Sequence, residues 1–245
     1  MYDYQNAKKR VWDILNSKTP VEKKSTIPSR EEEFTYKNGI KAWVGAIFVD
    51  IVDSSTIFKS GDEKIARIIR AFSKEIINIL SDSNNYRQIG IRGDCVYGIY
   101  STPYKSDLGE IFTLAYTVNT FMGMLNAILV KSGFQRIQVG IGLGCSEDLV
   151  IKVGKEKSGI NDMVWIGSAV VDAANLSSKA NRGNVSPIAM STLFYTNIIK
   201  SLIEENSSYN TWIKKYVELE DYKRFEFYHC SIIDSKFNDW IKQNL

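Results

Sequence analysis

The sequence of 245 residues predicts an α+β fold, a ferredoxin-like palm in which an antiparallel sheet carries helices on one face. Two observations support this prediction. Apolar runs of strand length and long helical patterns follow one another in the order β-α-β-β-α-β. The first long helical segment, which ends at Leu80, places its apolar residues on one face, as a helix that covers a sheet does. We expect a core domain at 41–235, preceded by a helix and linker at 1–40 and followed by a short helix at 236–245.

Charge and composition exclude several classes of protein. Hydrophobic residues make up 44% and charged residues 24% of the chain, which is typical of a globular protein. The 31 Lys and Arg residues are interspersed with 28 Asp and Glu residues, unlike the clustered positive charge of nucleic-acid-binding proteins. No apolar run approaches the ~20 residues that a membrane span needs, and the first residues lack the apolar stretch of a signal peptide. We therefore expect neither nucleic acid nor membrane as a partner.

Cysteine and histidine are too few for several kinds of site. Cys95, Cys145 and Cys230 are scattered and odd in number, which indicates reduced thiols and a cytoplasmic protein rather than a disulfide framework. His229 is the single histidine of the sequence, so His-based zinc sites and Ser-His-Asp triads are disfavoured. Chemistry in this chain should depend on carboxylates, cations and metal ions.

The first forty residues begin with a short amphipathic pattern and then become polar. Tyr4, Val11, Trp12 and Leu15 share one side of a predicted helix, and 23–33 has the composition of a linker. Two interpretations of the helix stay open: a cap on the surface of the core domain, or an arm used in dimerisation.

The core begins with a strand at 41–50 that ends in Asp50. Asp62 is a good N-cap for a following helix, whose apolar residues recur at helical spacing as far as Leu80. The segment 86–100 is predicted to form a β-hairpin with Arg92-Gly93-Asp94 near its tip, because glycine allows the backbone to turn there.

A second long helix is predicted at 107–131, with Asp107 and Glu110 as a capping pair. The alternating apolar pattern of 136–143 indicates a central strand. The remaining predicted elements are strands at 149–153 and 163–166, a helix at 168–182 with Ser168 as its N-cap, helices at 191–202 and 209–217, a strand at 222–233 and a short amphipathic helix at 236–242.

Asp50 and Asp94 are the strongest candidates for a reaction site. Each carboxylate lies at the end or tip of a predicted strand, and hard divalent cations such as Mg²⁺ and Mn²⁺ prefer oxygen ligands of this kind. The carbonyl of Ile51 is a possible third ligand. Two ions held in this way can promote an in-line phosphoryl displacement. Ser54 and Ser55, in a turn of small residues, leave backbone N–H groups available to bind phosphates.

A simpler interpretation competes at each position. An Asp at a strand end is often a turn former, and Gly-Asp is a common turn dipeptide. Asp53 competes with Asp50 as the metal ligand. We prefer Asp50 because it directly ends the apolar run, and we expect Asp53 to cap the turn.

Three motifs together resemble the class III nucleotidyl cyclases. Phe48-Val49-Asp50-Ile51 resembles their first metal motif, Arg92-Gly93-Asp94 resembles the second, and 165–176 resembles the strand-to-helix motif that faces substrate. The resemblance covers about 41–190, so 41–235 is expected to be the cyclase catalytic domain. It implies two Mn²⁺ or Mg²⁺ ions per site and attack of a ribose 3′-hydroxyl on the α-phosphate with release of pyrophosphate. It also implies a head-to-tail homodimer in which both subunits build each active site.

The sequence departs from the purine cyclases at the positions that read the base. Their base-reading Lys and Asp correspond to Gly90 and Val164, and their ribose-orienting Asn and transition-state Arg correspond to Val171 and Asn175. A site that depends on polar contacts loses several kcal/mol without them, so a purine substrate is disfavoured. The chain is then either a catalytically inactive relative or a member of a branch with another base and a rearranged cation.

Asn175, Lys179 and Arg182 lie at i, i+4 and i+7, on one face of the predicted helix. We assign Asn175 and Lys179 to catalysis, with Arg182 as an alternative source of positive charge. A solvated helix face is the competing interpretation.

This profile is similar to that of the standalone pyrimidine cyclases of bacterial anti-phage (Pycsar) signalling. Compact size, altered purine-reading positions and a C-terminal segment that ends in Phe237-Asn238-Asp239-Trp240 carry the similarity. It implies cyclic UMP or cyclic CMP made from UTP or CTP, with uracil preferred, and a separate effector that the product activates. Phe48, Ser54 and Ser55 are expected to contact substrate. Trp43, Arg92 and Tyr97 are candidates to fill a purine-sized pocket, with sheet packing or surface charge as the alternatives.

Other functions remain open on the same palm. A diguanylate-cyclase-like or polymerase-like transferase would form linear or dinucleotide products, but the hairpin keeps one acid, Asp94, where those enzymes have two. A catalytically inactive nucleotide-binding scaffold would bind without turnover. An adenylate-cyclase-like enzyme with an altered base pocket is the third alternative.

Overall fold

The computed structural model describes residues 1–29, 33–155, 159–220 and 223–245. One mixed sheet organises the chain, with its path running β3-β4-β2-β5-β7-β9-β8. The strands of this path are β3 (Tyr86–Arg92), β4 (Cys95–Ser101), β2 (Gly39–Ile51), β5 (Val139–Gly154), β7 (Ile188–Ser191), β9 (Lys223–Cys230) and β8 (Lys214–Glu220). Two further strands pair outside the path, β1 (Val21–Lys23) with β2 and β6 (Asn161–Ile166) with β5. The predicted α+β palm is confirmed, but its sheet is mixed rather than antiparallel throughout, because β1 pairs with β2 and β5 pairs with β7 in parallel.

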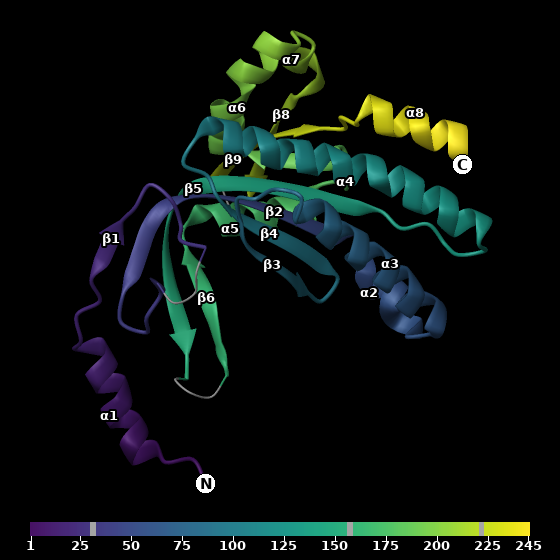
Figure 1. The fold of residues 1–245 in the computed structure, drawn as a ribbon. Helices are drawn as coiled ribbons and strands as arrows, with labels where there is room; N and C mark the ends of the chain where they lie inside the picture. The colour runs from purple at the N-terminus through teal and green to yellow at the C-terminus, as the bar shows by residue number, and fades with distance from the viewer. Residues whose placement is uncertain (30–32, 156–158, 221–222) are drawn as a thin grey trace.

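The two faces of the sheet carry different layers. On what we call the core face, Ile47, Val49 and Ile51 pack under α3 (Glu63–Leu80), α4 (Lys105–Lys131) and α6 (Thr192–Glu205). On the opposite face, which we call the site face, Phe48 and Asp50 alternate with them and α5 (Ser168–Lys179) packs against the sheet. Figure 1 shows α4 above the sheet and α5 below it. The prediction that helices cover one face only is therefore wrong, because α5 lies on the other.

Glycines in β5 bring α5 close to the sheet. A Cβ atom at Gly140, Gly142 or Gly144 would collide with backbone carbonyl oxygens of the segment 169–180. These glycines pair with Asp50, Phe48 and Ala46 of β2, so they lie on the site face. The absence of side chains here lets α5 lie directly on the strand.

The predicted strands 136–143 and 149–153 are one continuous strand, β5. The predicted break does not occur, because β5 pairs with β2 without interruption from Gly39↔Ile151 to Ile51↔Val139. The length of β5 is set by its continuous pairing with β2 and not by its own apolar pattern.

The helix starts differ slightly from the predictions. α4 begins at Lys105 with Tyr104 as N-cap, and the Asp107 side chain accepts from the backbone N–H of Tyr104 (2.8 Å). Glu110 accepts a hydrogen bond from Ser83 instead (3.3 Å). The N-cap of α5 is Gly167 and not Ser168, and α5 ends at Lys179.

The C-terminal segments are partly as expected. The predicted helix at 209–217 consists of α7 (Tyr209–Trp212) followed by β8, because 214–220 pairs with β9. Tyr222, where a strand was predicted to begin, lies outside the described residues, and β9 covers 223–230 of that prediction. The tail forms α8 (Ser235–Asn244).

The predicted linker and the residues before it pack partly against the core domain. Val21–Lys23 forms β1, and Ile27 is buried, with its backbone N–H bonded to Ser101 Oγ (2.9 Å) and its carbonyl accepting from Arg87 Nε (2.6 Å). Residues 30–32 of the predicted linker lie outside the described part. The first helix, α1 (Tyr4–Leu15), buries none of its residues and lies apart from the sheet (Figure 1).

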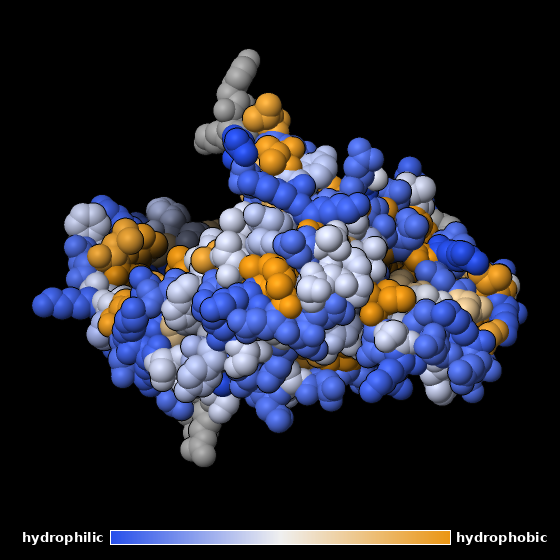
Figure 2. Space-filling model, turned by 90° about the horizontal axis from the view of Figure 1, so that it is seen from above, coloured by the Kyte–Doolittle hydropathy of each residue, from blue (hydrophilic) through white to orange (hydrophobic). Residues whose placement is uncertain are grey.

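α4 is the single described helix that has the length and composition of a membrane span. Twelve of its residues are buried inside the protein, as in a core helix. Figure 2 shows the molecule from above, where hydrophilic residues predominate and apolar residues form separate patches.

Candidate active site

Asp50 and Asp94 meet at one end of the β2–β4 pair. Asp50 pairs with Cys95 of β4, and Asp94 directly precedes Cys95 in the tight turn that Gly93 opens with a φ of +64°. Burial raises the pKa of Asp50 above its usual value, and the negative charge of Asp94 raises it further. A buried carboxyl beside a second carboxylate forms a site that a divalent cation would stabilise.

The protein groups at this position could bind a divalent cation if substrate phosphates and water supplied its remaining ligands. Among the described residues there is no cluster of three or more His, Cys, Asp or Glu side chains that could hold a metal ion. Mg²⁺ is commonly bound by one or two carboxylates together with substrate phosphates, so the pair Asp50 and Asp94 is sufficient in kind. Ile51 follows Asp50 on the strand, and its side chain is buried on the core face.

Arg182 is the cation that reaches this pair. Its Nη2 donates to Asp50 Oδ2 (3.1 Å), and its Nη1 donates to the carbonyl oxygens of Ser177 (3.0 Å) and Ala180 (3.1 Å) at the end of α5. The hydrogen bond and charge of Arg182 lower the pKa of Asp50, against the larger effects of burial and Asp94. Gly140, which pairs with Asp50, leaves the space that Arg182 occupies.

The structure does not bring Lys179 to the carboxylates. Lys179 Nζ donates to Glu218 of β8 (2.7 Å) and lies 5.7 Å from the centroid of the Phe225 ring. Asn175 is exposed, on the side of α5 opposite the residues that pack against β5. Within one chain, the assigned pair Asn175 and Lys179 therefore lies away from Asp50.

The turn after β2 runs directly into a short helix, α2 (Ser54–Ile57). Asp53 occupies its N-cap position with a φ of 55°, and its side chain makes no capping hydrogen bond. Its carbonyl accepts from the N–H groups of Thr56 (2.9 Å) and Ile57 (3.2 Å). The N–H groups of Ser54 and Ser55 belong to the first helical turn, which has no acceptor within the helix.

Phe48 and Tyr97 cover the site face next to the carboxylates. Their rings stack with centroids 5.1 Å apart and planes 14° apart. Tyr97 also occupies the space above Gly90, where any Cβ atom would collide with its phenol. The position that reads the base in purine cyclases is thus filled from the neighbouring strand.

Arg92 and Trp43 lie in different places. Arg92 pairs with Cys95 beside Asp94. Burial raises the pKa of Tyr97 and the charge of Arg92 opposes that shift, so Arg92 belongs to this region. Trp43 is at a core-face position of β2, 40% exposed, and seven residues from Asp50, roughly 23 Å along a strand. The structure does not bring Trp43 to the candidate site.

A polar network next to Tyr97 was missed by sequence reasoning. Trp165 Nε1 donates to Gln88 Oε1 (2.6 Å), and Gln88 Nε2 donates to Asp162 Oδ1 (3.1 Å) and Tyr97 Oη (3.3 Å). Gln88 is separated from its β6 partners by more than seventy residues, so no local pattern connects them.

Comparison with known proteins identifies the chain's relatives. No protein-family model matches it. It is 44% identical to the uridylate cyclase of Treponema porcinum over 245 residues, which are 100% of this chain and 82% of that protein. It is 30% identical to the uridylate cyclase of Gulbenkiania mobilis over 213 residues, 83% of this chain and 82% of the relative.

Solved structures support the fold. The adenylyl cyclase CyaB from P. aeruginosa matches with a TM-score of 0.62 and 17% identity over 80% of this chain and 96% of that one. The guanylyl cyclase Cya2 matches with a TM-score of 0.63 and 13% identity over 82% and 97%. With the matches to the two uridylate cyclases, one of which extends over the whole of this chain, these findings show that the chain belongs to the class III nucleotidyl cyclases of the uridylate cyclase type.

Proposed function

We propose that this enzyme converts UTP, or alternatively CTP, into the corresponding 3′,5′-cyclic nucleotide and pyrophosphate, and we favour UTP. The observation that carries the proposal is that the Asp50 carboxylate lies near Asp94 and contacts Arg182, in a chain 44% identical to a uridylate cyclase. In this reaction the ribose 3′-oxygen bonds to the α-phosphorus, the bond to the β-phosphate oxygen breaks, and the 3′-hydroxyl proton leaves to solvent. The enzyme is a phosphorus–oxygen lyase.

Asp50, Asp94 and the carbonyl of Ile51 would hold two Mn²⁺ or Mg²⁺ ions. Ions bound there would supply the charge that activates the 3′-hydroxyl and neutralises the leaving pyrophosphate. The carboxylates are fixed by the backbone, Asp50 by pairing of β2 with β4 and β5, and Asp94 by the turn at Gly93. Rigid placement lowers the cost of assembling the site.

Arg182 would change partners when Asp50 takes up a cation. Its guanidinium forms an ion pair with Asp50 in this structure. Freed from Asp50, the guanidinium would bind oxygens of the triphosphate, which its fork of N–H donors suits. Ser54 and Ser55 would bind the phosphates through the first N–H groups of α2, and Phe48 and Arg92 would contact the nucleoside.

A homodimer with composite active sites accounts for the exposed part of α5. Asn175 is exposed and lies away from this chain's Asp50, as described above. In a head-to-tail dimer it would orient the ribose bound to the second copy, and Lys179 would contribute charge after leaving Glu218. Both assignments are made from the resemblance and from this exposure.

We further place the product in second-messenger signalling. Cyclic UMP would activate a separate effector in anti-phage defence within the cytoplasm. The similarity to standalone pyrimidine cyclases supports this, as do Gly90 and Val164, which replace the polar purine-reading residues. The catalytic domain would comprise 41–235, with 1–40 and 236–245 as extensions.

The test is incubation of the protein with each of the four nucleoside triphosphates and Mn²⁺, followed by chromatography of the products. We expect cyclic UMP as the main product, and Asp94→Ala should reduce its formation at least about 1000-fold. The thermal midpoint of the variant should not fall, because the substitution removes one of two repelling carboxylates. An Asp94→Ala protein with full activity would refute the proposal, and binding without turnover would favour the scaffold interpretation.

A further inference from the structure

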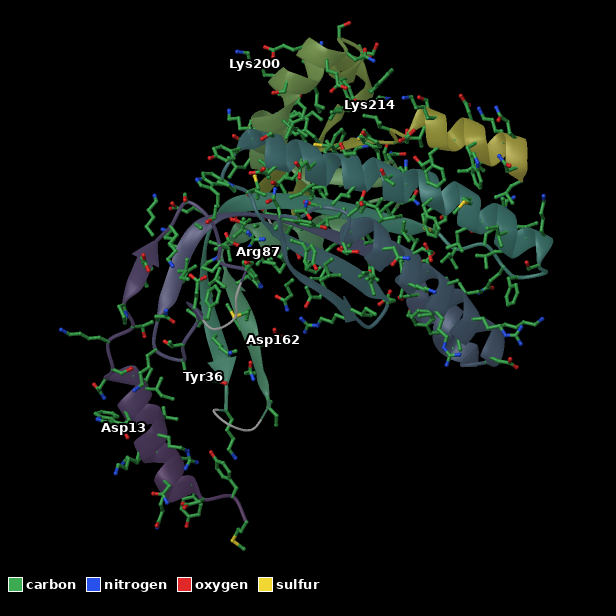
Figure 3. All side chains as sticks on the ribbon, in the orientation of Figure 1. Asp13, Tyr36, Arg87, Asp162, Lys200 and Lys214 are labelled. Carbon is green, nitrogen blue, oxygen red and sulfur yellow. The ribbon has the colours of Figure 1, made fainter. Side chains whose placement is uncertain are left out.

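A polar network on the site face has no role in the mechanism described so far. It consists of Trp165, Gln88, Asp162 and Tyr97, joined by the three hydrogen bonds given above. Asp162 lies on β6, on the side that faces β3 (Figure 3). The network borders a cavity of about 100 Å³, whose walls include Gln88, Asp162 and Trp165. Gln88, Asp162 and Trp165 therefore reach the surface at this cavity, and the half-buried Tyr97 lies beside it, in contact with Gln88.

The orientation of the Gln88 amide is fixed by its neighbours. An indole N–H can only donate a hydrogen bond, so Trp165 requires the amide oxygen of Gln88 on its side. A carboxylate accepts, so Asp162 requires the amide nitrogen on the other side. The two requirements agree, and they leave the second amide hydrogen of Gln88 directed at Tyr97 Oη.

This orientation determines what Tyr97 can offer. Its oxygen accepts from Gln88, so its hydroxyl hydrogen remains available to donate. Stacking on Phe48 holds the ring, and Gly90 leaves the space in which it lies. Tyr97 pairs with Phe48, two residues from Asp50, so the backbones of Tyr97 and Asp50 are about 7 Å apart along the strand direction. A nucleotide with its phosphates at Asp50 and its base toward Phe48 would therefore extend past Tyr97.

We propose that the Tyr97 hydroxyl reads the carbonyl at C4 of uracil, and that Gln88 and Trp165 are positioning residues that keep this hydroxyl a donor. The C4 group is what distinguishes the two pyrimidines, a carbonyl oxygen in uracil and an amino group in cytosine. A donor facing that group pairs with uracil and opposes cytosine. The inference rests on the proposed function, because it assumes a pyrimidine nucleotide with its phosphates at Asp50 and Asp94.

The decisive variant inverts the polarity of the network without changing its net charge. In the double variant Q88E/D162N, the new carboxylate accepts from Trp165, from the new amide and from the Tyr97 hydroxyl. The Tyr97 oxygen would then face the base as an acceptor, which suits the amino group of cytosine. We expect the ratio of kcat/KM for UTP to that for CTP to fall about 10- to 100-fold relative to the unmodified enzyme.

Two single variants make the test independent of the double variant's folding. Tyr97→Phe removes the hydroxyl, and Trp165→Phe removes the donor that fixes the amide, so both should lower the same ratio. Tyr86→Phe is the matched control, because it removes an exposed hydroxyl on the same sheet edge and should leave the ratio unchanged. Thermal melting of each variant checks that it is folded.

The outcomes separate this inference from the proposed function. An unmodified enzyme that prefers CTP would overturn the inference, as would folded Tyr97→Phe and Q88E/D162N proteins that keep the original ratio. An unmodified enzyme that forms no cyclic pyrimidine nucleotide would instead overturn the proposed function. A reduced ratio in both, with the control unchanged, would support the assigned roles of Tyr97 and Gln88.

Discussion

The core face and the site face of the sheet are packed by different kinds of residue. On the core face, apolar side chains such as Ile47, Val49 and Phe72 fill the space beneath three helices. On the site face, glycines replace side chains under α5, and there are two separate sets of polar contacts, Arg182 with Asp50 and Gln88 with Asp162 and Tyr97. The strand β2 takes part in both, because alternate residues point to opposite faces.

This difference separates the residues that stabilise the fold from those that form the candidate site. The core face gains stability from burial of apolar side chains, whereas burial of charged groups on the site face lowers stability. Burial raises the pKa values of Asp50 and Asp148, which shows that the folded state disfavours their ionised forms. Close packing of α5 on glycines keeps those groups in place. Substitutions on the two faces should therefore have different signs and sizes.

The largest effect on stability is expected at Gly142. Its alanine variant would place a Cβ atom against the backbone of α5 at Ala173 and Ser177, which cannot move aside as a side chain can. Gly142→Ala should lower the free energy of unfolding by about 3 kcal/mol. Gly109→Ala is the matched control on α4, where nothing lies within 4 Å, and it should raise stability by about 1 kcal/mol. Denaturant unfolding of both variants measures the difference, and equal effects would contradict the contrast between the faces.

The second effect concerns the cation of the site face. Arg182→Ala should lower kcat about 30-fold, corresponding to about 2 kcal/mol, because it removes the guanidinium beside Asp50. Lys179→Ala is the comparison, since that cation is bound to Glu218. Initial rates with UTP at saturating Mn²⁺ measure both. A larger loss for Lys179→Ala, in a protein that melts like the unmodified one, would make Lys179 rather than Arg182 the main source of positive charge in the reaction.

Local patterns were sufficient for the core face and insufficient for the site face. The helical spacing that ends at Leu80 predicted α3, because one helix face depends on its own residues. The family motifs also located Asp50 near the end of β2 and Asp94 in the turn between β3 and β4. The contact of Arg182 with Asp50 joins residues 132 positions apart, and the Trp165–Gln88 bond spans 77. No periodicity in the sequence encodes such contacts, since they arise only when strands pair and α5 packs.

The smallest expected effect is a difference in the pH dependence of stability between Asp148 and Glu147, two neighbouring acidic residues on β5. Asp148 is buried on the site face, where Ser146 donates to its Oδ1 and Oδ2 has no partner among the described residues. Burial raises the pKa of Asp148, so the folded state disfavours its ionised form. A carboxyl with a raised pKa in the folded state stabilises at low pH, and that contribution is lost as the pH rises. Asp148→Asn should thus increase stability by about 1 kcal/mol at pH 7 and by less near pH 4.

Glu147 is the adjacent control and should behave in the opposite way. A hydrogen bond from Lys23 lowers the pKa of Glu147, with a smaller contribution from Lys41. A lowered pKa gives stability at neutral pH that is lost on acidification, so Glu147→Gln should destabilise at pH 7 and destabilise less as the pH falls toward the pKa of Glu147 in the folded state. Denaturant unfolding of both variants across pH 4–8 measures the two slopes. If the stability changes of both variants had pH slopes of the same sign, burial on the site face would not destabilise the ionised form of Asp148. That result would contradict the proposed difference between the two faces of the sheet.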